Sequence, residues 1–135
     1  MSFLIFSVER VNRDYKANES AVIAVMGLLS ANQVNFKTVD GCYGNTQEVS
    51  FLVQATHERL VADICKLYDQ DCYLKVDDNK NANLVYPNGE ETPVGLFQNV
   101  AKSVAESLPN YTKDGSNYWV ASKELYPKPA FKSGV

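Results

Sequence analysis

Short apolar runs alternate along this chain with longer segments of helical periodicity. Runs that are short enough for strands, and rich in β-branched and aromatic residues, occur at 3–9, 35–43, 48–55, 72–76 and 82–86. Apolar residues spaced three or four apart predict two helices, at 20–32 with Ser20 as N-cap and at about 57–69 after Thr56. Val22, Val25, Met26 and Leu29 form the predicted buried face of the first helix.

The resulting order β-α-β-β-α-β predicts an α+β fold of the ferredoxin-like type. In that arrangement an antiparallel sheet carries both helices on one face. The other sheet face would then be free of the chain's own helices and available for contacts between subunits.

The C-terminal part predicts an extension of this sheet. Residues 94–100 form a candidate strand, residues 101–108 have some helical character, and Asp114-Gly115 predicts a hairpin turn. We expect residues 1–122 to form one domain. Residues 123–135 contain Pro127 and Pro129, and we expect them to be an extended or disordered tail.

Composition excludes several function classes. The 135 residues carry 13 Lys and Arg against 16 Asp and Glu, so a net charge of −3 offers no electrostatic reason to bind nucleic acid or anionic lipid. No apolar run has the length of a membrane span, and the apolar N-terminus lacks the basic residues and cleavage site of a signal peptide. Three cysteines and one histidine without metal-ligand spacing predict reduced thiols in the cytoplasm and no metal site.

Candidate chemistry concentrates at Gly41-Cys42-Tyr43, where Gly41 and Gly44 are expected to let the backbone turn sharply, and at Glu48. Because side chains alternate along a strand, Glu48 and Ser50 share the less apolar face of their strand. By themselves a tyrosine beside a turn and a glutamate at a strand start remain ambiguous, since packing and solvation explain them equally well. His57 is expected to be an exposed residue at a helix start, and no phosphate-binding glycine loop is present.

Further motifs accompany these residues in a fixed order. They are Ser7-x-x-Arg10-x-Asn12, Gly41-Cys42-Tyr43, Cys65 with Gln70-Asp71-Cys72, Leu84-Val85-Tyr86 with Gly89, and Gly95-x-Phe97-Gln98-x-Val100. The ordered set resembles the phage-encoded S-adenosylmethionine lyases, formerly called hydrolases. The chain departs from that pattern in a shorter segment between Tyr43 and Glu48, and in Asn99 where the family often has glutamate.

The resemblance implies an enzyme that splits S-adenosylmethionine into 5′-methylthioadenosine and homoserine lactone, without metal or cofactor. In this family the substrate's own carboxylate is thought to attack its γ-carbon and expel the thioether. The resemblance also implies a homotrimer with active sites between subunits, in the cytoplasm of an infected bacterium. Loss of S-adenosylmethionine there would counter methylation and restriction.

The same resemblance assigns roles to individual residues. Tyr43 and Glu48 are the expected catalytic residues, with Glu48 holding the α-ammonium group and Tyr43 packing against the methionine part while donating a hydrogen bond. Cys42 and Ser50 are expected to bind substrate. Phe97 and Gln98 are expected to meet adenine by stacking and hydrogen bonding.

Three alternatives stay open from the sequence. The chain is a candidate for a non-catalytic trimeric module of the same fold that binds an adenine nucleotide and regulates a partner. It is also a candidate for a hydrolase that gives homoserine directly. A hydrolase would need a general base to activate water, and Glu48 is the candidate for that role. An inhibitor that contacts a host enzyme directly is the third.

Overall fold

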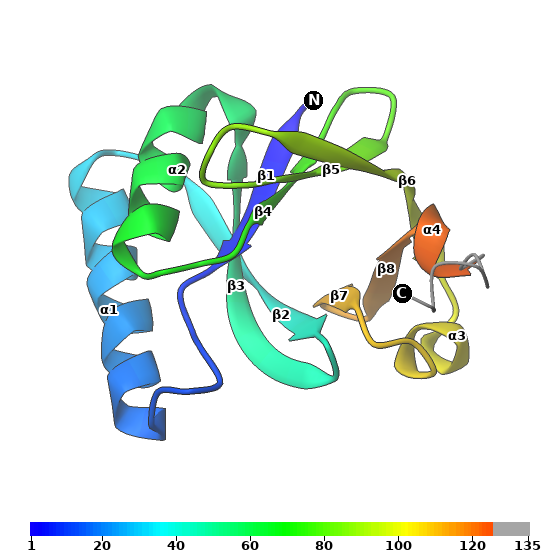
Figure 1. The fold of residues 1–135 in the computed structure, drawn as a ribbon, viewed down its shortest axis with the longest axis horizontal. Helices are drawn as coiled ribbons and strands as arrows, with labels where there is room; N and C mark the ends of the chain where they lie inside the picture. The colour runs from blue at the N-terminus through cyan, green and yellow to red at the C-terminus, as the bar shows by residue number, and fades with distance from the viewer. Residues whose placement is uncertain (126–135) are drawn as a thin grey trace.

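The computed structural model describes residues 1–125, in which eight antiparallel strands close into a barrel (Figure 1). Around the barrel the strands follow the order β1-β3-β2-β7-β8-β6-β5-β4. The strands are β1 (Phe3–Ser7), β2 (Phe36–Tyr43), β3 (Thr46–Gln54), β4 (Tyr73–Val76), β5 (Asn81–Val85), β6 (Glu91–Val100), β7 (Tyr111–Asp114) and β8 (Asn117–Ala121). The helical elements are α1 (Tyr15–Ala31), the 3-10 turn η1 (Ala55–His57), α2 (Glu58–Leu67), α3 (Lys102–Glu106) and α4 (Ser122–Leu125).

The predicted ferredoxin-like sheet is wrong, because the sheet has no open edge. The predicted order β-α-β-β-α-β is present up to β4, and β4, β1, β3 and β2 are neighbours with α1 and α2 on their outer side. However, β2 also pairs with β7, and β4 also pairs with β5. The segments expected to be an extension therefore cover the sheet face that was expected to remain free for subunits.

Strand β6 makes this closure possible by serving two partners. Its first half pairs with β5 and its second half with β8, with a register shift opposite Ala82 and Asn83. Gly95, between the two halves, has φ +93°, and a Cβ atom there would lie 2.0 Å from Ser122 Oγ. Only glycine adopts this conformation in so little space, and β6 exchanges β5 for β8 as its partner just after this residue.

Two apolar cores lie on opposite faces of the β1–β3 wall. Outside, Phe51 and Val53 pack with α1 and α2 in the larger core, and inside, Ile5, Val39 and Phe97 belong to a core within the barrel. The alternation predicted for β3 is confirmed, because Phe51 and Val53 face the helices while Leu52 faces the interior.

Helix α1 begins earlier than predicted. The Asp14 side chain accepts a hydrogen bond from Ala17 N at 2.7 Å and caps the helix, so Ser20 lies inside it. Of the predicted buried face, Val25 and Leu29 are fully buried, whereas Met26 is 38% exposed.

The predicted tail falls largely outside the described residues. Residues 122–125 form α4, and positions 126–135 are not described. None of the helices found between residues 1 and 125 has both the length and the apolar character needed to cross a membrane.

Candidate functional site

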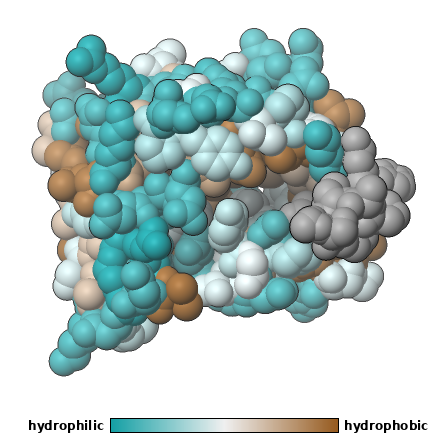
Figure 2. All heavy atoms as spheres, in the orientation of Figure 1, coloured by the Kyte–Doolittle hydropathy of each residue, from teal (hydrophilic) through white to brown (hydrophobic). Residues whose placement is uncertain are grey.

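A cavity of about 540 Å³ occupies one end of the barrel. This volume lies within the range of small-molecule binding pockets. In the space-filling view the molecule is hollowed near the middle of the face shown, with mostly hydrophilic residues around the hollow (Figure 2). The lining has a polar end, formed by Ser7, Glu9, Arg10, Glu48, Asp71 and Cys72, and an apolar floor, formed by Ile5, Leu74, Val94, Phe97 and Trp119.

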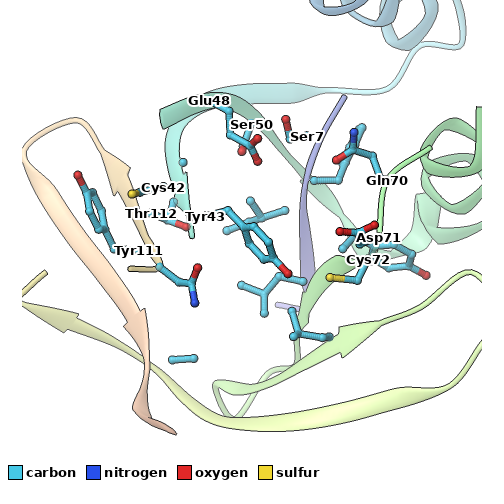
Figure 3. A pocket seen from close by; sticks show the side chains of 18 of the residues that line it. Ser7, Cys42, Tyr43, Glu48, Ser50, Gln70, Asp71, Cys72, Tyr111 and Thr112 are labelled. Atoms are coloured by element: carbon cyan, nitrogen blue, oxygen red, sulfur yellow. The ribbon is translucent and has the colours of Figure 1, made fainter. Parts of the chain in front are cut away.

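Glu48 lines the cavity beside Ser50, and its neighbour across the ladder has no side chain. Glu48 pairs with Gly41 of β2, and both lie on the inner face together with Ser50 (Figure 3). A Cβ atom on Gly41 would lie 2.7 Å from Ser50 Oγ and 3.7 Å from Glu48 Cγ. Gly41 therefore leaves room for the Ser50 hydroxyl beside Glu48. It does not form the sharp turn, which falls at Gly44 and Asn45 with positive φ.

The environment of Glu48 favours its neutral form. Burial, followed by the nearby Glu9 carboxylate, raises the pKa of Glu48 to about 7, against a hydrogen bond with Ser7 that lowers it. Glu9 is held in place because its Oε2 accepts a hydrogen bond from Val49 N at 2.5 Å. A carboxyl group that titrates near neutral pH inside a cavity is a candidate functional group.

Tyr43 extends across the cavity toward the segment before β4 (Figure 3). Its hydroxyl is hydrogen-bonded with Cys72, and burial together with the charges of Cys72 and Asp71 raises the pKa of Tyr43 to about 12. The phenol therefore stays protonated and able to donate at neutral pH. This contact joins two of the motifs recognised in the sequence.

The apolar floor is built on one aromatic pair. The rings of Phe97 and Trp119 are stacked with centroids 5.4 Å apart and 9° between their planes. Both side chains, with Ile5, also line a second cavity of about 170 Å³ toward the other end of the barrel, which Lys80 borders. The floor therefore lies between the two cavities.

The structure places the predicted site residues in two groups. Tyr43, Glu48, Ser50 and Phe97 line the large cavity, and Cys42 also borders it. The thiol of Cys42, however, lies on the other face of β2 and donates to Pro109 O at 3.5 Å. Gln98 does not line the cavity, because side chains alternate along β6 and Phe97 takes the inner face.

Several cavity residues received no role from the sequence. Arg10, Asp71 and Cys72 belong to the quoted motifs, so their place in the order of motifs was a usable signal. Glu9 and Trp119 lie outside those motifs, and only the closed barrel brings them to the site.

The fold and the site define a small antiparallel barrel with a cavity of small-molecule size in its interior, lined by a carboxyl group and a phenol. The sequence model of the S-adenosylmethionine lyase family matches residues 4–122, and the chain belongs to this family. A search of curated proteins finds no match to the chain.

Proposed function

We propose that the protein cleaves S-adenosylmethionine to 5′-methylthioadenosine and homoserine lactone. A carboxylate oxygen of the substrate attacks its own γ-carbon, the bond between that carbon and sulfur breaks, and the electron pair stays on sulfur. A carboxylate and a sulfonium disappear together, and no water, proton or electron is taken up. The leaving group and the nucleophile both come from the substrate, so the step requires no metal or cofactor.

One observation carries the proposal beyond family membership. Residues from motifs far apart in the sequence line a single cavity, among them Ser7, Arg10, Tyr43, Asp71 and Phe97. A chain that only shared the fold of the family would have no reason to keep these residue types around one space large enough for the substrate.

Glu48 is the proposed acceptor for the substrate's α-ammonium group. Its carboxyl group faces the cavity and titrates near pH 7 in the ligand-free protein, so a bound ammonium replaces the proton at little cost. Fixing the ammonium leaves the carboxylate on the same carbon free to turn toward the γ-carbon. Positioning of this kind contributes roughly 7–11 kcal/mol at best.

The other proposed residues shape the space around the reacting bond. Tyr43 packs against the methionine part, with Ser50 beside Glu48, and Phe97 with Trp119 forms the surface for adenine. Because the reaction removes two opposite charges, an apolar floor that excludes water favours the transition state over the charged substrate.

The homotrimer and a cytoplasmic location in an infected cell remain proposals from the family resemblance, as does the countering of host restriction. The sheet face that the sequence predicted to form subunit contacts lines the interior of the barrel. Sedimentation equilibrium of the purified protein tests the trimer.

The test of the proposed reaction is incubation of the purified protein with S-adenosylmethionine in metal-free buffer, followed by proton NMR. Methylthioadenosine with homoserine lactone as the first products is the expected result. Homoserine from the earliest time points would mean a hydrolase. Unchanged substrate would overturn the enzymatic proposal and leave a binding protein.

A further inference from the structure

Arg10 stands at the polar end of the cavity with part of its hydrogen-bonding capacity unused. Its Nε donates to Asn12 Oδ1 at 3.2 Å, and its Nη1 donates to Asp69 O. Nη1 is also 3.8 Å from Asp71 Oδ1, at a side chain that is 73% exposed. Within residues 1–125, Nη2 has no hydrogen bond to protein, although Arg10 lines the cavity.

The other charges around the cavity give Arg10 a distinct position. Glu9, Asp71 and the ionised form of Glu48 supply negative charge at the polar end, and Lys123 supplies the other positive charge of the lining. The Lys123 ammonium group donates a hydrogen bond to Pro93 O, where α4 meets β6. Arg10 is therefore the cation at the end where Glu48 lies.

Two hydrogen bonds of Glu9 hold Arg10 and Glu48 at the same end of the barrel. The carboxylate of Glu9, the neighbour of Arg10, accepts a hydrogen bond from the N–H of Val49, the neighbour of Glu48. Glu9 O also accepts a hydrogen bond from the Gln70 side chain at 3.0 Å, which ties the Asp71 segment to the same place. A carboxylate and a guanidinium held together in this way match the two charges on the α-carbon of an amino acid.

We propose that Arg10 binds the α-carboxylate of the substrate through Nη2, opposite the ammonium site at Glu48. This inference rests on the proposed function and adds the second half of amino-acid recognition to it. One carboxylate oxygen is held by Arg10 and the other is free to attack the γ-carbon. The exposed Asp71 occupies Arg10 weakly in the ligand-free protein, so the substrate displaces a contact that contributes little.

The test compares two ligands that cannot react. S-adenosylhomocysteine and its decarboxylated counterpart, S-adenosyl-3-thiopropylamine, differ only in the carboxylate, and neither has a sulfonium leaving group. Titration calorimetry gives the dissociation constant of each for the wild type, Arg10→Gln and Arg10→Lys. Arg59→Gln is the matched control, because Arg59 is exposed on α2 and lines neither cavity.

We expect Arg10→Gln to raise the dissociation constant of S-adenosylhomocysteine by about tenfold or more, as for loss of a charged hydrogen bond. The dissociation constant of the decarboxylated ligand should change by less than about twofold. For Arg10→Lys the dissociation constant of S-adenosylhomocysteine should lie between those of the wild type and Arg10→Gln. Arg59→Gln should leave both dissociation constants unchanged. The ratio of the two constants within one variant is insensitive to a partly unfolded sample.

The role of Arg10 would be overturned if Arg10→Gln weakened the binding of both ligands equally. It would also be overturned if the wild type bound both ligands with the same dissociation constant. Failure of the lyase proposal is separate, because it is read from the products formed by the wild type. If the expected difference between the two dissociation constants were found but the wild type formed no products, Arg10 would remain a carboxylate-binding residue and the proposed reaction would be rejected.

Discussion

The polar inner face of β3 depends on a neighbouring residue that contributes no side chain. Gly41 pairs with Glu48, and a Cβ atom on Gly41 would overlap Ser50 Oγ, whereas it would only be in ordinary contact with Glu48. Gly41 therefore lets Ser50 share the inner face of β3 with Glu48 without pushing β2 outward. Sequence reasoning placed both groups on that face from alternation alone, but it assigned Gly41 to a turn.

Replacing Gly41 with alanine tests this packing. We expect Gly41→Ala to lower the free energy of unfolding by about 1–3 kcal/mol, because the new methyl group overlaps Ser50 Oγ. Urea denaturation measures the change. In a Ser50→Ala background the same substitution should cost less than half as much, and an equal cost in both backgrounds would contradict the proposed clash.

The pKa of Glu48 sets an expected pH dependence of activity. Burial raises this pKa to about 7, so the ligand-free enzyme loses its carboxylate, and with it the ammonium site, as the pH falls through 7. We expect kcat/KM for S-adenosylmethionine to fall below pH 7. Glu48→Gln should lower kcat/KM at pH 8 by about tenfold or more and remove this limb of the profile.

Steady-state kinetics between pH 5.5 and 8.5 (a range chosen to bracket ~7) measures both effects. Glu106→Gln is the control, since Glu106 is exposed on α3 and lines neither cavity. Unchanged activity in Glu48→Gln would show that the residue does not hold the substrate.

At the scale of elements, sequence patterns located most strands and helices but not all of their ends. The start of α1 was missed because its first five residues, 15–19, include no buried side chain and therefore carry no apolar stripe. Several residues near this point favour N-caps, and only the structure shows that Asp14 takes that position. The register of β6 was equally hidden, since a shift by one residue exchanges Phe97 and Gln98 between cavity and exterior.

The cap of α1 gives a prediction at this scale. We expect Asp14→Ala to lower the free energy of unfolding by about 1 kcal/mol, because Ala17 N loses its acceptor. Asp14→Asn keeps an acceptor and should cost a few tenths of that amount. Thermal unfolding followed by circular dichroism compares the two, and equal losses would mean that the charge, not the cap, is what stabilises the helix.

At the scale of the whole molecule, the closure of the barrel was beyond the reach of local patterns. An apolar inner face looks the same in a sequence whether a partner subunit or the chain's own later strands cover it. The deciding contact pairs Cys42 with Tyr111, which are about half the chain length apart in sequence, and periodicity contains no signal for it. The same closure brings Trp119 to the cavity, which explains why the site could be predicted only in part.

Closure also predicts a single cooperative unfolding transition. Trp119, the only tryptophan, lies in β8, whereas most helical residues are in α1 and α2. Because β2–β7 and β4–β5 join the two parts of the barrel, tryptophan fluorescence and helical circular dichroism should show the same urea midpoint. Two separated midpoints would mean that the parts unfold independently. Trp119→Phe confirms the origin of the fluorescence signal.

The aromatic floor has a consequence for how molecules enter and leave the large cavity. Ile5, Phe97 and Trp119 line both cavities and stand between them, so the stacked rings separate the large cavity from the smaller one. In the proposed reaction we therefore expect methylthioadenosine to leave by the polar end, where the substrate also enters. Product and substrate would then exclude each other from the cavity, and we expect product release to limit the turnover rate.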